Sequence, residues 1–190
     1  MTFLHIFTEE TSLKIVLETI LPKILPENVY FQIYSHQGKQ DLERALTLTL
    51  PTISKNTSKK ILVTRDQDSS DCKDLKQNLL QIIGLNCHCD FLIRIVCREL
   101  EAWYLGDMLA IEKAYPRFKH EQHVNKAEYR NVDRLQNPNR ELLKIIPEYS
   151  NREYLPKLEA AEYISPYLSL ENNNSESFNQ TITAILKLVS

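Results

Sequence analysis

Glycine is scarce in this chain, with three among 190 residues. Average proteins contain roughly 7% glycine, so a chain of this length would normally hold about 13. A chain that uses glycine so sparingly keeps one where the backbone needs unusual freedom or where another group approaches closely. Gly38, Gly84 and Gly106 are therefore positions of interest.

Other shortages exclude whole classes of protein. No apolar run approaches the roughly 20 residues that span a bilayer, and residues 1–5 lack the basic segment of a signal peptide, so we expect a cytoplasmic protein without membrane association. The formal net charge of -2 argues against a generic polyanion binder with a dominant basic face. With 43% hydrophobic and 25% charged residues, the composition is that of a globular domain rather than a disordered or disulfide-stapled chain.

The four cysteines suit a reducing compartment. Cys87-His88-Cys89 suggests zinc, but structural zinc sites space their ligands as C-x(2–4)-C and add a second pair elsewhere. That second pair is missing here. A plain loop before a strand is the preferred interpretation of this segment.

Hydrophobic periodicity predicts an α/β fold. Short runs rich in Ile, Val, Phe, Leu and Tyr alternate with helix-period segments, and the strands recur about every 30 residues, the length of a βαβ unit. We therefore expect a mainly parallel sheet of about four strands flanked by helices. The predicted strands are residues 2–8, 29–34, 60–65 and 91–96, and the predicted helices between them are residues 12–21, 41–50 and 70–83.

The second half of the chain has no convincing strand. Residues 99–115 read as a helix that is interrupted or ends near Gly106-Asp107. We expect residues 1–115 to form a Rossmann-like α/β core and residues 116–190 a helical extension packed on it, the two making a single structural unit. The further predicted helices are residues 140–146, 158–167 and 177–188.

Charged residues follow every predicted strand. Open parallel sheets bind ligands outside the carboxyl ends of their strands, and all four ends meet at one edge. This edge is therefore predicted to gather carboxylates with a cation at its rim. The residues concerned are Glu9 and Glu10 after the first strand, Gly38 and Lys39 after the second, Arg65, Asp66 and Asp68 at the third, and Glu99 and Glu101 after the fourth.

Such an edge suits Mg²⁺ or Mn²⁺, which prefer oxygen ligands and substrate phosphates. We expect Glu9, Asp66 and Asp68 to be both metal ligands and catalytic groups, because two carboxylates at i and i+2 in an extended segment project on the same side. Lys39 would hold the non-bridging phosphate oxygens. The competing interpretation is that polar βα loops only cap helices and that Arg65 or Lys39 neutralises the acids without metal.

The remaining predicted roles are less direct. Glu10, Glu99 and Glu101 would complete the metal shell, although an ideal helix would point Glu99 and Glu101 in nearly opposite directions unless the turn before it reorients Glu99. Ser12, Gly38, Lys39 and Arg65 are predicted to bind the substrate. Trp103 is expected to pack the helical half onto the sheet, with stacking on a base as the alternative.

Several blocks of the sequence carry a resemblance that covers nearly the whole chain. They are residues 8–12, 37–42, 66–68, 71–76, 94–95, 99–107, 157–161 and 174–178. On these blocks the chain resembles a bacterial family catalogued as domain-of-unknown-function family 4276, whose members are Toprim-like. Toprim domains occur in topoisomerases, primases and overcoming-lysogenization-defect nucleases. A typical Toprim domain has glycine where this chain has Glu10, and an aliphatic residue where it has Thr8.

The resemblance implies a magnesium-dependent nuclease that cleaves phosphodiesters in a nucleic acid. Family members often lie beside ATPase genes linked to anti-phage defence, which implies an effector subunit working with an ATPase partner, with a homo-oligomer as one option. Two alternatives stay open. One is a non-catalytic Toprim-fold subunit that docks a basic partner protein through its acidic edge, and the other is a phosphoryl-transfer enzyme acting on a small nucleotide.

Overall fold

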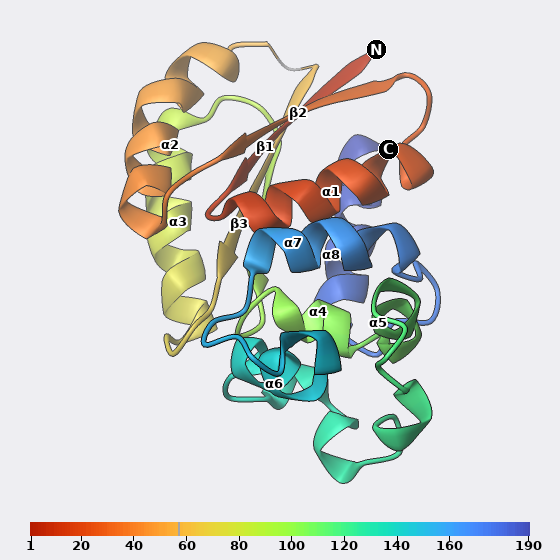
Figure 1. The fold of residues 1–190 in the computed structure, drawn as a ribbon. Coiled ribbons are helices and arrows are strands. Elements are labelled where there is room, and N and C mark those ends of the chain that lie inside the picture. The colour runs from red at the N-terminus through yellow and green to blue at the C-terminus, as the bar shows by residue number, and fades with distance from the viewer. Residues whose placement is uncertain (57) are drawn as a thin grey trace.

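The computed structural model describes residues 1–56 and 58–190, and these residues form a sheet of four parallel strands (Figure 1). The strands lie in the spatial order β2-β1-β3-β4. Each predicted strand is present to within one residue at either end, so the predicted α/β fold is confirmed. The strands are β1 (Thr2–Thr8), β2 (Val29–Ser35), β3 (Lys59–Asp66) and β4 (Phe91–Val96).

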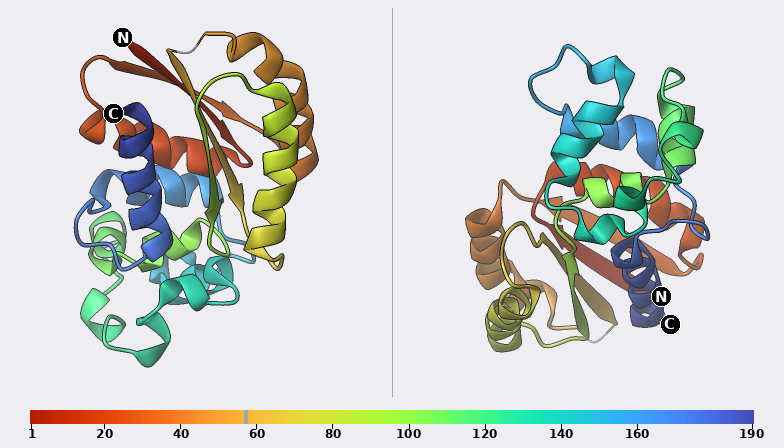
Figure 2. Two further views of the ribbon diagram at one scale, coloured as in Figure 1. Left: turned by 180° about the vertical axis from the view of Figure 1, so that it is seen from behind. Right: turned by 90° about the horizontal axis from the view of Figure 1, so that it is seen from below.

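Helices cover both faces of the sheet, which explains why its strands are so apolar. Figures 1 and 2 show α2 (Lys39–Ile53) and α3 (Cys72–Asn86) on one face and α1 (Thr11–Ile24) on the other. Alternate side chains of a strand therefore enter two different cores. In β1, Ile6 packs on the α1 side and Phe7 on the side of α2 and α3.

The order of the strands reverses between β1 and β3. The chain passes from β1 to β2 on one side of β1, and then crosses back to β3 on the other side. In open α/β sheets such a switch point is where ligands bind, because the following helices leave on opposite faces. Thr8 of β1 pairs with Thr64 of β3, so the chain segments just beyond them, which carry Glu9 and Asp66, leave the sheet next to each other.

The second half of the chain is helical, as predicted, and the predicted helix at residues 99–115 is split at Gly106-Asp107. No helix among the described residues is long and apolar enough to cross a membrane. The helices are α4 (Glu101–Leu105), α5 (Met108–Ala114), α6 (Pro138–Ile145), α7 (Lys157–Ile164) and α8 (Glu176–Val189), and short 3-10 helices lie at His120–Gln122, Ala127–Tyr129, Val132–Arg134, Pro147–Tyr149 and Ser165–Tyr167.

These helices share a hydrophobic core with the sheet face that α1 covers. Leu4 of β1 belongs to the same buried cluster as Trp103 of α4 and Phe178 of α8. Trp103 is fully buried, meets Phe178 edge to face at 5.3 Å between ring centroids, and donates its Nε1–H to Ser177 Oγ at 3.3 Å. The predicted packing role of Trp103 is therefore confirmed, and stacking on a base is not open to a buried ring.

The Cys87–Cys89 segment is a loop between α3 and β4, as the preferred interpretation holds. The two Sγ atoms lie 3.8 Å apart and all four cysteines are free. Burial and the neighbouring Cys87 raise the pKa of Cys89 to about 12. Within residues 1–56 and 58–190 no third metal-binding side chain joins them, so the zinc interpretation has no support.

Gly106 is required by a close approach between two distant segments. A Cβ at this position would lie 2.2 Å from Asn173 Oδ1 and 2.7 Å from the backbone nitrogen of Ser175. The Asn173 side chain meanwhile donates to the carbonyl of Trp103 at 2.9 Å, and its backbone neighbour Asn174 donates to the carbonyl of Gly106 at 2.8 Å. The absence of a side chain at Gly106 thus lets the loop before α8 pack directly against α4.

We predict that Gly106→Ala lowers the free energy of unfolding by about 1–3 kcal/mol, the usual cost of forcing extra atoms into a packed site. Gly84→Ala is the matched control. A Cβ there meets no atom within 4 Å, and Gly84 lies inside α3, so alanine should stabilise by about 0.5–1 kcal/mol. Urea unfolding of both variants measures the difference. Equal stabilities for the two would contradict the close-approach argument.

Candidate functional site

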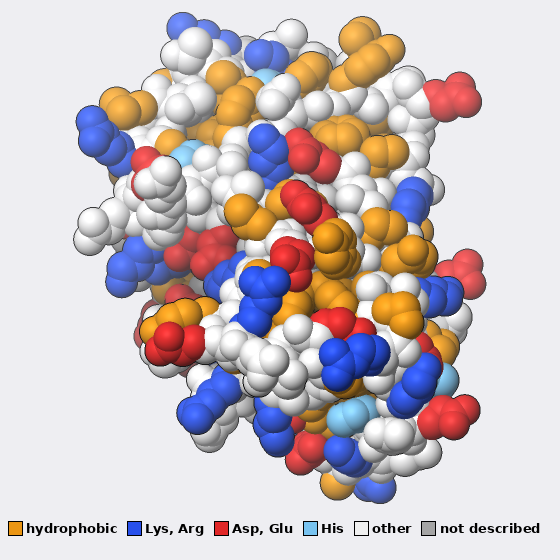
Figure 3. All heavy atoms as spheres, in the orientation of Figure 1, with side chains coloured by type: hydrophobic (Ala, Val, Ile, Leu, Met, Phe, Trp, Pro, Cys, Tyr) orange, Lys and Arg blue, Asp and Glu red, His pale blue; other side chains and the backbone are white. Residues whose placement is uncertain are grey.

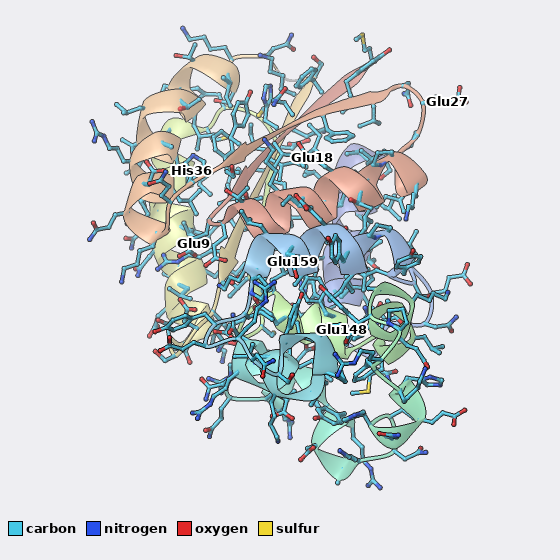
Figure 4. All side chains as sticks on the ribbon, viewed as in Figure 1. Glu9, Glu18, Glu27, His36, Glu148 and Glu159 are labelled. Carbon is cyan, nitrogen blue, oxygen red and sulfur yellow. The ribbon has the colours of Figure 1, made fainter. Side chains whose placement is uncertain are left out.

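The edge formed by the carboxyl ends of the strands gathers carboxylates from three chain segments. Glu9 and Glu10 follow β1, Asp66 ends β3, and Glu101 begins α4. Figure 4 labels Glu9 near the end of the sheet, and Figure 3, in the same orientation, shows acidic side chains gathered in that area with basic side chains beside them. The switch point of the sheet is therefore acidic, and some of its carboxylates form ion pairs with neighbouring basic side chains.

Asp66 lies at the centre of this group. It is the last residue of the buried strand β3, and its relative exposure is 8%. Burial raises the pKa of Asp66 well above its usual value, and the charges of Glu10, Glu101 and Glu9 raise it further, while Lys157 acts in the opposite direction. The carboxylate of Asp66 is thus held where its negative charge is unfavourable unless a cation is near.

Glu101 is still more buried, at 1% exposure. Its Oε1 accepts a hydrogen bond from Asn139 Nδ2 at 3.3 Å, but its Oε2 is buried without a hydrogen-bond partner among the described residues. Burial raises the pKa of Glu101 to about 7, against the opposing effect of Lys157. The Tyr104 hydroxyl, whose pKa burial and the charges of Glu101 and Asp66 raise, is likewise buried without a partner there.

Glu9 is linked to the core of the sheet through Arg65. Arg65 Nε lies 3.7 Å from Glu9 Oε2, and Arg65 Nη1 donates to Glu43 Oε1 of α2 at 2.9 Å. Burial raises the pKa of Glu9 while Arg65 opposes that rise. Arg65 is itself buried and paired on both sides, so it neutralises acids, as one interpretation held, and is not free to bind a substrate as predicted.

Glu10 is paired with a lysine from the opposite end of the sequence. Lys157, the first residue of α7, donates to Glu10 Oε1 at 3.0 Å and to Glu10 Oε2 at 2.9 Å. Burial acts to lower the pKa of Lys157, but the carboxylates of Glu101, Glu10 and Asp66 raise it above its ordinary value. The ammonium of Lys157 thus acts as the principal counter-charge of the acidic group.

The backbone at Asp68 differs from the conformation assumed for it. The argument from i and i+2 positions assumed an extended segment, but Asp68 has φ of 51° in the left-handed region, and its side chain is exposed. Its backbone N–H donates to the carbonyl of Arg98 at 2.8 Å, and Arg98 also has a left-handed φ of 60°. The chain therefore turns after Gln67, so the extended segment assumed for Asp66 and Asp68 was wrong. The charge of Asp68 nevertheless acts on Glu9 and raises the pKa of that carboxyl.

The turn before α4 brings Glu99 and Glu101 to a common partner. Because the helix begins at Glu101, Glu99 lies outside it and does not follow the helical periodicity. Glu99 Oε2 accepts the backbone N–H of Asn139 at 2.9 Å, and the side chain of Asn139 binds Glu101. The turn before the helix therefore reorients Glu99, which was the condition under which Glu99 and Glu101 could face the same site.

The predicted cation Lys39 is exposed at the first turn of α2 and forms no ion pair within the described residues. Gly38 before it has φ of 91°, which only glycine adopts freely. Ser12 is buried and donates to Glu10 Oε2 at 3.2 Å. Ser12 thus orients Glu10.

The donor set is suited to a hard divalent cation. Carboxylate oxygens are the ligands that Mg²⁺ and Mn²⁺ prefer, and Glu9 Oε2 and Glu101 Oε2 are buried oxygens without hydrogen-bond partners among the described residues. In the conformation of the described side chains, however, no three carboxylate, imidazole or thiol groups are close enough to hold one ion together. A cation here would be held by Asp66 and Glu101 with Glu9, once Glu9 has turned away from its pair with Arg65.

Sequence reasoning missed three residues of this site. Lys157 stands within a block that carries the family resemblance, but its charge was not connected with the strand ends. Asn139 and Glu43 had no signal at all, because an asparagine after a proline and a glutamate on a helix are ordinary surface residues. Their contacts arise from tertiary packing of α6 and α2, which periodicity does not specify.

The burial of Glu101 predicts a pH dependence of stability. Its pKa is raised from 4.5 to about 7 in the folded state, so the folded state binds more protons than the unfolded one between these values. The free energy of unfolding should therefore fall as pH rises from about 4.5 to 7, by up to about 3 kcal/mol from this group. In metal-free buffer, Glu101→Gln should make that fall shallower, as measured by urea unfolding at several pH values.

The control is Glu171→Gln, which removes the same charge from an exposed position. It should leave the pH profile of stability as in the unmodified protein. If Glu101→Gln and Glu171→Gln had the same profile, the buried carboxyl of Glu101 would not be the group that titrates.

Comparison with known protein families finds one match, which covers nearly the whole chain. A family described as a domain of unknown function (DUF4276) matches residues 8–186, from the end of β1 to the last helix. No curated protein and no solved structure matches the chain. The matched region includes Glu9, Asp66, Glu101 and Lys157, together with strands β2, β3 and β4 and the helical half. The chain therefore belongs to the DUF4276 family.

Proposed function

We propose that this protein is a Toprim-like, magnesium-dependent nuclease that hydrolyses phosphodiester bonds in a nucleic acid. The observation that carries the proposal is the group of buried carboxylates at the switch point of the sheet, above all Asp66 and Glu101. A glutamate after the first strand and an aspartate after the third are the arrangement for which the chain resembles Toprim domains. Hydrolysis adds water across a P–O bond and leaves a phosphomonoester and an alcohol.

The electrostatics of the site support a cation-dependent role. Burying carboxylates close together is costly, and a site that only needed stability would replace them by apolar residues. Asp66, Glu101 and Glu9 all have raised pKa values because of burial. A bound divalent cation would supply Lewis-acid stabilisation of the charge that develops on the phosphate oxygens.

Space for a substrate lies beside these carboxylates. A pocket of about 430 Å³ is lined by Asp68, Ser69, Arg98, Glu99, Gln136 and Asn137. It opens at the ends of β3 and β4, where the left-handed residues Asp68 and Arg98 hold the two loops together through the hydrogen bond between their backbones. Strained backbone of this kind is often kept at functional sites. We assign this pocket to the nucleotide next to the scissile phosphate.

The partners follow from the resemblance alone. We propose that the protein acts as the effector subunit of an ATPase-associated defence system, with Mg²⁺ or Mn²⁺ as its cofactor. The nucleic acid is the substrate, and the ATPase is the partner protein.

The alternative, a non-catalytic subunit that docks a basic partner through its acidic edge, fits these residues less well. Docking needs exposed carboxylates, whereas Asp66 and Glu101 are buried, and Glu10 and Glu9 are already paired with Lys157 and Arg65. An acidic docking surface would instead be solvated and unpaired. The other alternative, an enzyme that acts on a small nucleotide, would use the same phosphoryl-transfer chemistry. Assays with a mononucleotide and with nucleic acids distinguish it from the nuclease.

We predict that Asp66→Asn abolishes metal-dependent cleavage, with a loss of at least roughly 10²-fold, the scale on which one electrostatic group contributes to a transition state. Asparagine keeps the shape and removes the buried charge, so the metal-free variant should be as stable as the unmodified protein or more stable. The rise in melting temperature on adding Mn²⁺ should disappear. The assay uses labelled single- and double-stranded DNA and RNA, a mononucleotide, and a chelator.

Asp90→Asn is the matched control, because Asp90 precedes β4 at the opposite end of the sheet and pairs with Lys60 at 2.5 Å. This variant should cleave as the unmodified protein does. Cleavage that survives the chelator, or that survives Asp66→Asn, would contradict the proposal. Complete inactivity of the unmodified protein on every substrate, with binding of a partner that Asp66→Asn does not weaken, would favour the docking alternative.

A further inference from the structure

We propose that Lys157 binds the substrate phosphate and acts as a built-in second cation of the site, with Glu10 as the positioning residue that holds it there. This inference rests on the proposed nuclease function and goes beyond it, since it assigns a group outside the α/β core. It also gives a role to Glu10, which stands where a typical Toprim domain has glycine.

The ammonium of Lys157 has one N–H donor that its contacts with Glu10 do not use. A lysine ammonium has three N–H donors, and Lys157 uses two of them on the two oxygens of Glu10, at 3.0 and 2.9 Å. Glu10 is in turn oriented by the hydroxyl of Ser12. The ammonium is thus fixed in place by one carboxylate, while a further donor is available for another acceptor.

The position of this ammonium places it between the buried acids and open solvent. On one side, the charges of Glu101 and Asp66 act on it strongly enough to raise its pKa. On the other side, Lys157 lines a pocket of about 370 Å³ together with Thr11, Ser12, His36, Gln37, Gly38, Glu10 and Leu158. About a third of its side chain, 34%, remains exposed. An anion entering this pocket would reach the ammonium directly.

Two helix N-termini beside the pocket also favour an anion, and the carboxylate of Glu10, which lines it too, is already paired with Lys157. The first turns of α1 and α2 begin beside it, at Thr11 and just after Gly38, and neither helix has an N-cap side chain that accepts from its free N–H groups. Free N–H groups at helix N-termini carry partial positive charge. The left-handed Gly38 has no Cβ, so a phosphate can approach the backbone there. The Lys157 ammonium adds the full charge that these groups lack.

A purely structural tether would look different. Lys23 links the same two halves of the chain by donating to the carbonyl of Pro166 at 3.1 Å, and no carboxylate is needed for that link. Lys157 instead lies among carboxylates, of which those of Glu101 and Asp66 are buried. A compact ammonium can stabilise phosphate oxygens without the fixed geometry of a metal ion. The site therefore needs one divalent cation, with Lys157 in the place of a second.

The experiment compares Lys157→Met, Lys157→Arg and Lys23→Met as full-length proteins. Calorimetric titration with MnCl₂ and melting curves with and without Mn²⁺ measure binding of the metal alone. Turnover of the best nucleic-acid substrate measures kcat and KM. We expect one Mn²⁺ per unmodified chain. Lys157→Met should bind Mn²⁺ as tightly or more tightly, because a competing positive charge is gone, while kcat falls by roughly 10²–10³-fold.

Lys157→Arg keeps the charge and should retain more turnover than Lys157→Met, whereas Lys23→Met should match the unmodified protein in both measurements. Unchanged kcat in folded Lys157→Met would overturn the role of Lys157 and leave the nuclease function intact. Loss of Mn²⁺ binding in Lys157→Met would overturn it too, because the lysine would then only shape the metal site. An unmodified chain that neither binds Mn²⁺ nor cleaves would instead reject the nuclease function itself, and the lysine role with it.

Discussion

The structure depends on one electrostatic constraint: carboxylates are buried at the point where the order of the sheet reverses. Asp66 ends a strand that is buried on both faces, and Glu101 begins the helix that follows the next strand. Neither charge is favourable in such surroundings without a cation. The basic residues Arg65 and Lys157 balance the group, and each comes from a segment that must be correctly placed before the pairing can form.

That constraint also explains why the helical half is built onto the core. The helical segments supply Lys157, which reaches Glu10, and Asn139, which binds the acids on either side of the turn before α4. Gly106 allows the loop before α8 to lie against α4, which fixes the helix that carries Glu101. Packing of the second half and assembly of the site are therefore parts of one event, and a change far from the carboxylates can alter them.

Much of the fold could be predicted from the sequence, because the strands are apolar runs of clear length and the helices between them have strong periodicity. The gathering of acids at one edge followed from parallel topology. Side-chain directions did not follow, since the left-handed turn at Asp68 breaks the extended geometry that its spacing suggested. The counter-cation was sought at Lys39, next in sequence to a strand end, whereas Lys157 arrives through tertiary packing that local patterns do not encode.

In the proposed function, a divalent cation binds among the carboxylates between β1 and β3. The most direct measurement is an anomalous difference map from crystals of the protein soaked in MnCl₂. We expect a peak in contact with carboxylate oxygens of Asp66 and Glu101, with Glu9 turned towards it and Lys157 still bound to Glu10. A map from fully soaked crystals with no peak at this edge, and with Asp66 and Glu101 unmoved, would contradict it.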